Sequence, residues 1–437
     1  MQTRLTMNAA RQSDAISIAR VLCILGVVYV HAWTGLSGAD LEQLRGTSQE
    51  SLRWVLMEIF GHSAVPLLGL ISGWLVSGSS RTRDWGSHVG RKMQTILLPM
   101  LTWNALGILL VSGAAFLFHM LAPVPHSAEW IVQELFIVSR NPDINVQMPF
   151  LRDLFLCMLA APLLVRLPGW LLMTVAGIAL ACQITGLGPP VLMRPSILFF
   201  FVIGMLARRG TLADRTAALP FAAAAVPFIL LMSFQLILIL RPGPDPSGVP
   251  GAALDMAVRI AAALFFWRLS WALAASPARG LLLKIEPYAF LLFCVHLILI
   301  WLGGPLLGML FGKMGSPFYP FYLIAQPFLI LAAVVLLGTR LSSVPSSTTA
   351  ASMRKGCARP KGQAAFRASI ARAAAMAMAK LRRRAAASKI WPLTMISSAP
   401  VRSMKAVRSR STSACVPMLE TLSTSSSIMR AWTGSVS

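Results

Sequence analysis

One arginine and one histidine in the first apolar segment have the types and the spacing that chemistry inside a membrane would use. Arg20 and His31 are separated by ten residues, VLCILGVVYV, that carry no charge. Eleven helical steps of about 100° leave the two side chains within about 20° of one face and about 16 Å apart along the axis. A cation and a titratable base therefore follow one another along a single helix face.

This separation suits a long substrate with a charged end and a reactive end. A charged Arg20 near the cytoplasmic end of the helix can hold the phosphates of a coenzyme, while an extended pantetheine arm of comparable length carries its thioester toward His31. His31 can then act as general base on an acceptor hydroxyl, since an unperturbed imidazole pKa of about 6.5 allows proton uptake at neutral pH. The spacing alone is equally compatible with a structural role, in which Arg20 reaches lipid headgroups and His31 bonds a neighbouring helix.

The composition indicates that the elements around this helix lie in lipid. The 437 residues are 56% hydrophobic and only 12% charged, which a water-soluble domain could not cover with polar surface. Apolar runs of about 20 residues recur along the first ~340 positions, with polar loops rich in Gly and Pro between them. These features exclude a soluble enzyme and predict an all-α, polytopic transmembrane helical bundle.

The apolar runs predict about ten transmembrane helices. The expected ranges are 16–34, 54–77, 95–121, 149–166, 169–186, 196–207, 217–240, 252–274, 286–303 and 319–339. The connection 122–148, which contains Trp130 and Phe136, is a candidate amphipathic segment along the membrane interface. Basic residues crowd one set of alternate loops, and the opposite set contains only Arg45, Arg53, Arg140, Arg194, Arg241 and Lys313. The positive-inside rule then places both termini in the cytoplasm and predicts a multi-pass protein of the cell inner membrane.

Residues 341–437 differ from the predicted transmembrane domain, residues 1–340. The first 340 residues carry 23 Lys and Arg against 14 Asp and Glu, whereas the remainder carries 16 against the single Glu420, so the net charge of +24 is mostly a property of this tail. A tail with so few large apolar residues cannot bury a core. We expect it to be disordered; alternatives are a basic helix at 364–384 on anionic lipid, or a frame-shifted continuation that is not genuine coding sequence. No nucleic-acid partner is expected.

Motifs for other kinds of chemistry are absent from the sequence. The six cysteines are scattered singly, with no CxxC pair, and there is no phosphate-binding GxxxxGK[ST], no GxGxxG and no HExxH. The segment Gly69–Gly73 lacks the spacing of a GxSxG nucleophile elbow, so Ser72 is expected to let helices approach closely rather than to form an acyl-enzyme.

Four further motifs follow the Arg20 and His31 pair along the chain. They are VPLLGLISGWL at 65–75, Arg91-Lys92 ahead of Leu97-Leu98-Pro99, PFLRDL at 149–154, and Glu286-Pro287-Tyr288 followed by His296. Each motif is short, but their order and their coverage of about residues 12–340 make the joint match specific. In these features the chain resembles the acyltransferase-3 family of membrane acyltransferases.

The resemblance implies a ten-span bundle that uses cytoplasmic acyl-CoA, commonly acetyl-CoA, for O-acetylation of sugars in surface polysaccharide, lipopolysaccharide or related glycans. Arg20 and His31 match the family's essential pair and are the predicted catalytic residues, with Arg20 also binding the coenzyme. Arg91 and Lys92 are predicted to bind the coenzyme as well, although Gln94 stands where many members have the second arginine of Arg-x-x-Arg. The predicted partners are acyl-CoA, a glycan acceptor and membrane lipid, with no metal.

Two further predicted site elements lie later in the chain. Arg152 and Asp153 are candidates for acceptor-sugar binding or for a structural ion-pair network. Because adjacent helical residues point about 100° apart, we expect each to find a separate partner. His296 is a second-rank candidate for substrate binding, beside the more common role of a packing or hydrogen-bonding histidine.

Two pairs at helical spacing favour structure over chemistry. Asp255 and Arg259, at i and i+4, are expected to pair within their own helix. Glu58 and His62 share a face by the same spacing, but the sequence offers no further ligand beside them, which argues against a metal site.

A transporter or exporter is the main alternative to an acyltransferase. The same buried Arg, His and Asp residues could bind a solute or relay protons. The two halves of the chain show no obvious repeat, and Gly- or Pro-broken spans do not fall in matching positions, which argues mildly against a transporter. A purely structural scaffold would leave the register of Arg20 and His31 unexplained.

Overall fold

The fold comes from a computed structural model that describes residues 2–31, 46–187, 191–210, 212–240, 248–312 and 315–342. The chain divides into two units, and the first contains all the described residues up to Val335. The account below concerns that unit. The predictions made for the tail lie outside the described residues, apart from the last turn of the final helix.

Within the described residues the chain is helical throughout and contains no strand. The elements are α1 (Gln2–Val30), α3 (Ser48–Ser77), η1 (Ser80–Arg83), α4 (Trp85–Lys92), η2 (Met93–Leu97), α5 (Leu98–Gly107), η3 (Ile108–Ser112), α6 (Gly113–Phe118), α7 (Ala128–Phe136), α8 (Pro149–Leu164), α9 (Gly169–Thr185), α10 (Pro195–Arg209), α11 (Leu212–Ala218), α12 (Phe221–Leu240), α13 (Gly248–Leu273), α14 (Arg279–Phe311) and α15 (Tyr319–Ser342). The fold is therefore all-α, as predicted.

Helix starts follow from local sequence. Thr47 caps α3, because its side chain accepts a hydrogen bond from the Glu50 backbone N–H. Pro149 and Pro195 are the first residues of α8 and α10. At this position a backbone N–H would have no acceptor within the helix, so proline loses no hydrogen bond. The PFLRDL motif therefore begins a helix, with Arg152 and Asp153 as its fourth and fifth residues.

Seven of the described helical stretches are long and apolar enough to cross a membrane. They are Ala10–Val30, Ser48–Ser77, Trp85–Phe118, Phe221–Leu238, Gly248–Leu273, Arg279–Phe311 and Tyr319–Thr339. The three other expected spans form the helices α8, α9 and α10 of 16, 17 and 15 residues. A multi-pass membrane protein is therefore supported, while the count of ten spans and the cytoplasmic placement of the termini remain predictions.

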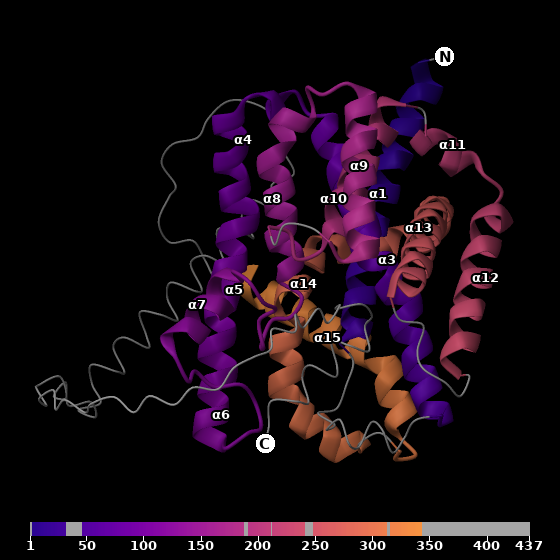
Figure 1. Ribbon diagram of the computed structural model, residues 1–437. Coiled ribbons are helices and arrows are strands. Elements are labelled where there is room, and N and C mark those ends of the chain that lie inside the picture. The colour runs from indigo at the N-terminus through magenta and orange to yellow at the C-terminus, as the bar shows by residue number, and fades with distance from the viewer. Residues whose placement is uncertain are drawn as a thin grey trace, which may run out of the picture. The chain divides into compact units, whose positions relative to one another are not determined.

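The helices α3 and α10 approach each other so closely that glycine is required at their contact (Figure 1). A Cβ atom added at Gly73 would overlap the carbonyl oxygen of Phe201, and one added at Gly204 would overlap that of Leu70. Membrane helices associate through such small-residue contacts because lipid offers no hydrophobic driving force between helices. The close approach predicted at Ser72 is thus provided by its neighbour Gly73 and by Gly204 of the opposing helix.

The connection between α6 and α8 matches the predicted interfacial segment only in part. It contains the short helix α7, capped by the Ser127 side chain. Trp130 of α7 is only 1% exposed and its Nε1 donates to Asp143 Oδ2 at 2.7 Å, so this side chain packs within the protein and not along a lipid surface. Phe136 and two other apolar residues of α7, Ile131 and Val132, are exposed and match the expectation. The segment folds inward because its indole and carboxylate side chains find partners there.

Replacing Gly204 by Ala should separate α3 from α10, since the added methyl group would overlap the Leu70 carbonyl. We expect a loss of about 1–3 kcal/mol of stability, typical of an overpacked interface. Thermal unfolding of the full chain in detergent measures it. Gly177→Ala on α9 is the matched control, because a Cβ there would meet nothing within 4 Å. Equal melting temperatures for the two variants would contradict the close-contact interpretation.

Candidate functional site

α1 and α14 pack as a parallel pair whose polar side chains meet in register. Three pairs follow one another along the two helices: Asp14 with Arg279 at 2.7 Å, Arg20 with Glu286 at 3.4 Å, and His31 with His296, whose ring centroids are 5.4 Å apart. The residue numbers rise together, so the helices run in the same direction. The face of α1 that carries Arg20 and His31 is therefore the face that packs on α14, and it brings two predicted site residues, His31 and His296, together.

His296 has the hydrogen-bonding pattern of an imidazole that can accept a proton. Its Nδ1 lies 3.1 Å from the carbonyl oxygen of Leu292 and 2.9 Å from that of Phe293, so Nδ1 carries the hydrogen and donates it. Its Nε2 is then a lone pair, and it has no hydrogen-bond partner within the described part of the chain. The side chain is fully buried. A basic nitrogen thus lies inside the protein beside His31.

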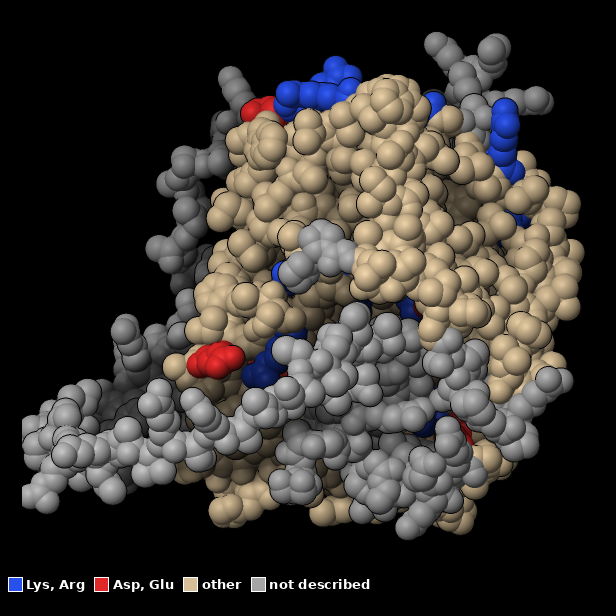
Figure 2. Space-filling model, in the orientation of Figure 1, with Lys and Arg blue, Asp and Glu red and all other residues tan. Residues whose placement is uncertain are grey.

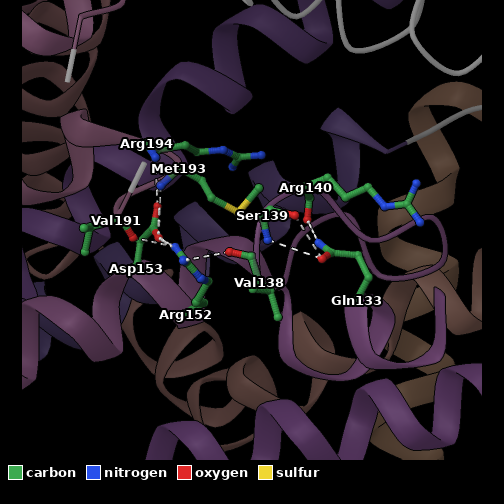
Figure 3. Close-up of polar contacts among 9 residues, drawn as sticks. All are labelled: Gln133, Val138, Ser139, Arg140, Arg152, Asp153, Val191, Met193 and Arg194. Carbon is green, nitrogen blue, oxygen red and sulfur yellow. Dashed lines mark hydrogen bonds and ion pairs between the residues drawn. The ribbon is translucent and has the colours of Figure 1, made fainter. Parts of the chain in front are cut away.

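Asp153 and its neighbour Arg152 join three segments of the chain (Figure 3). One carboxylate oxygen accepts from Arg152 Nη1 at 2.6 Å, and the two oxygens accept the backbone N–H groups of Met193 at 3.4 Å and Arg194 at 2.9 Å. Arg152 also donates to the carbonyl oxygens of Val191 and of Val138. Arg152 and Asp153 each have separate partners, as expected, but they also bond to each other, because the arginine side chain is long enough to turn back to its neighbour although the two Cβ atoms diverge.

Arg194 is a functional candidate that sequence reasoning missed. The sequence places it with the few charges of the external loops, but in the structure its side chain is largely buried and lies close enough to His31 for their charges to interact. It also lies within electrostatic range of Asp153 and of Arg259. No hydrogen bond or ion pair of its guanidinium is seen among the residues described. A short polar turn between two apolar helices was the signal that could have identified it.

Arg20 and His31 do not touch each other. Arg20 is 37% exposed and engaged by Glu286, whereas His31 lies eleven residues further along α1, about 16 Å in helical rise. The arginine is therefore too far away to act on the atoms that His31 would act on. Its exposure instead suits a role in binding a group that arrives from solvent.

Arg91 and Lys92 lie on another helix, in the last turn of α4. Arg91 is exposed, and α4 is held against α8 because the His88 ring donates from Nε2 to the Met158 carbonyl at 3.1 Å. Figure 2 shows Lys and Arg side chains gathered at one end of the drawn face, the end at which Figure 1 labels α4 and α8. Arg91 and Lys92 thus lie on α4, whereas His31 and His296 meet where α1 packs on α14.

A second buried polar cluster connects α3 to α13. His62 lies between Glu58 and Asp255, with Nδ1 2.6 Å from Glu58 Oε2 and Nε2 2.9 Å from Asp255 Oδ1. The predicted pair within α13 is confirmed, since Arg259 Nε lies 2.6 Å from Asp255 Oδ2. Both nitrogens of His62 are occupied, so this histidine has no lone pair for a substrate. Among the residues described, no group of three or more His, Cys, Asp or Glu side chains forms a candidate metal site.

The connection between α7 and α8 is anchored by Glu134 inside the protein. The carboxylate accepts the backbone N–H groups of Asp143 and Ile144. Burial raises the pKa of Glu134 to about 7, against the opposite effect of those two hydrogen bonds. The indole Nε1 of Trp301 on α14 donates to the Ile144 carbonyl at 3.2 Å, so the connection also contacts the helix that carries His296.

Comparisons with known proteins agree with the order of motifs in the sequence. A family model described as an acyltransferase domain, acyltransferase-3, matches residues 13–344. The succinoglycan biosynthesis protein ExoH of Rhizobium meliloti (strain 1021) is 30% identical over 351 residues, which cover 75% of this chain and 88% of that protein. No solved structure matches the chain.

Asp153→Asn should loosen the turn that carries Arg194, because the variant removes the charge that holds Arg152 and two backbone N–H groups. Breaking a buried ion pair from one side typically costs about 3–5 kcal/mol, and we expect a loss of stability of this order in thermal unfolding in detergent. Asp84→Asn is the control, since Asp84 is exposed and its side chain caps no helix. If both variants unfold at the wild-type temperature, Asp153 does not join the three segments.

Proposed function

This chain belongs to the acyltransferase-3 family and is a multi-pass membrane acyltransferase, and we propose that it transfers an acyl group from coenzyme A to a hydroxyl of a surface polysaccharide. The observation that carries the proposal is the contact of His31 with His296, a buried histidine with a lone-pair nitrogen, on a helix pair that also bears Arg20. A relative named for succinoglycan biosynthesis supports a glycan as acceptor.

In the proposed reaction His31 is the general base. It takes the proton of the acceptor hydroxyl while that oxygen attacks the thioester carbonyl carbon. The tetrahedral intermediate then collapses, the carbon–sulfur bond breaks, and the leaving thiolate takes the proton back from the imidazolium. His31 thus returns to its neutral form, and the products are an ester and free coenzyme A.

Arg194 supplies the charge that this intermediate needs. The carbonyl oxygen becomes an oxyanion during attack, and a preorganised cation within a region of low dielectric stabilises it strongly. Arg194 is the cation close to His31, and Asp153 fixes its backbone. Arg20 is placed too far along α1 for this role.

Arg20 binds the donor instead. Its half-exposed guanidinium can exchange Glu286 for the phosphates of coenzyme A, and the helical rise of about 16 Å to His31 matches an extended pantetheine arm. Arg91 and Lys92 add positive charge for the same phosphates from the end of α4. Acetyl-CoA is the proposed donor, and the proposed location is the inner membrane with the coenzyme on the cytoplasmic side.

His31→Asn should abolish acylation while the protein still inserts, because an amide cannot take the hydroxyl proton. We expect transfer from labelled acetyl-CoA to fall by about 10²–10⁴-fold, the range for loss of a general base. Mass analysis of surface glycans from cells with the wild-type gene or the variant should show the loss of one acyl group.

His119→Asn is the matched control, since His119 is exposed and its backbone lies in the left-handed region that Asn tolerates. This variant should acylate at the wild-type rate. Full activity in the His31 variant would dismiss the mechanism, and glycans of unchanged mass in cells that lack the gene would dismiss the proposed function.

Arg20→Gln and Arg194→Gln should affect different kinetic constants. We expect the Arg20 variant to raise KM for acetyl-CoA by about 10–100-fold with kcat retained, as the loss of a charged hydrogen bond to the donor predicts. The Arg194 variant should lower kcat by about 10²–10³-fold with little change in KM. The exposed Arg140 provides the control substitution, Arg140→Gln. A fall in kcat for Arg20 with none for Arg194 would reverse the assignment.

A further inference from the structure

The end of the connection between α7 and α8 places the side-chain amide of Gln147 beside His296. Gln147 lies two residues before α8 and is only 3% exposed. Its Nε2 donates to the Phe293 carbonyl oxygen at 3.4 Å. The same oxygen lies 2.9 Å from Nδ1 of His296. The amide of Gln147 and the imidazole of His296 therefore converge on one carbonyl group of α14 and are close neighbours.

This shared carbonyl takes one N–H from each side chain, and each side chain keeps an acceptor without a partner among the described residues. Because Nε2 of Gln147 faces the carbonyl, Oε1 is the atom that remains, and it has no hydrogen-bond partner among the described residues. Nε2 of His296 is likewise a lone pair without a partner in that part of the chain. Two buried acceptors without partners thus belong to side chains that share one carbonyl group, and one of these side chains, His296, lies beside His31.

The backbone around Gln147 is held from several directions, so the amide is preorganised. Asn145 Nδ2 donates to the Trp103 carbonyl at 3.2 Å and lies 3.3 Å from Asn104 Oδ1. Trp301 Nε1 donates to the Ile144 carbonyl at 3.2 Å. These contacts come from α5 and α14, which fixes the connection between two helices and with it the position of Gln147.

The chemistry of the two acceptors selects one class of ligand. A buried acceptor without a partner costs about 1–3 kcal/mol, so a ligand that supplies hydrogens is favoured. An anion is disfavoured because it brings only acceptors, and a cation is disfavoured by the nearby charge of Arg194. A neutral molecule with several hydroxyl groups satisfies both atoms.

We propose that Gln147 is an acceptor-binding residue, which with His296 receives hydroxyl groups of the carbohydrate and turns a further hydroxyl toward His31. This inference rests on the proposed function. It assigns a residue outside the recognised motifs to the selection of the sugar. Because the geometry needs a second hydroxyl beside the reacting one, the substrate class is a sugar residue with neighbouring free hydroxyl groups.

The experiment measures the KM for acceptor in the full chain, purified in detergent. The probe is the producing cell's own extracellular polysaccharide, stripped of esters by alkali and cut to oligosaccharides, with labelled acetyl-CoA as donor. Gln147→Met keeps the length of the side chain but removes Oε1. We expect the KM for the oligosaccharide to rise about tenfold, as the loss of one hydrogen bond predicts, with the KM for acetyl-CoA unchanged.

Gln235→Met is the matched control. Gln235 lies on α12, and its Oε1 is also buried without a partner among the described residues, so the variant repeats the chemical change at another helix. It should leave both KM values at the wild-type level. If Gln147→Met does not fold, Gln147→Asn, which withdraws the amide by one methylene, should raise the acceptor KM in its place.

The outcomes separate this inference from the proposed function. Transfer by the wild type with an unchanged acceptor KM in a folded Gln147 variant overturns the inference alone. Absence of transfer by the folded wild type overturns the proposed function, and the inference falls with it. A rise in the KM for acetyl-CoA rather than for the oligosaccharide assigns Gln147 to the donor and also overturns the inference.

Discussion

A polar side chain in the hydrocarbon region of a bilayer needs a partner within the protein, and this requirement governs how α1 and α14 are joined. Three polar side chains along α1, those of Asp14, Arg20 and His31, each meet a polar side chain of α14. The first two pairs neutralise charge, whereas the third pairs two imidazoles that need no counter-ion. From the N-terminal ends of the two helices onward, the contacts therefore change from ion pairs to a pair of imidazoles, which can take part in proton transfer.

The other buried polar groups divide into satisfied and unsatisfied sets. The cluster around His62 has a carboxylate on each ring nitrogen and behaves as a closed structural unit. His296 and Gln147 each donate to one carbonyl and retain an open acceptor. Chemistry is expected at His296 and Gln147, because there, on the helix pair that carries His31, a substrate can complete the hydrogen bonding. His62 and His296 are the same residue type, and they differ in whether both ring nitrogens have hydrogen-bond partners.

The helices, the family and part of the candidate site could be predicted from the sequence. Apolar runs predict the helices well, because in lipid the backbone has few other ways to satisfy its hydrogen bonds. The resemblance to the acyltransferase-3 family is confirmed, and the common face of Arg20 and His31 follows from helical periodicity. Arg194 and Gln147 lie in non-helical turns without periodicity, so their approach to His31 depends on tertiary packing that spacing alone does not encode.

The parallel register of α1 and α14 has a consequence for chain-length selection. An α-helix is nearly inextensible, so the distance between Arg20, the proposed phosphate anchor, and His31, the proposed base, stays constant from one turnover to the next. In the proposed reaction the coenzyme A tether has one length, so the thioester carbonyl carbon would stop at one depth whichever acyl group is attached. A preference for short or long acyl groups must then depend on the residues beyond His31 and His296. The sequence of that region can change without moving the two histidines.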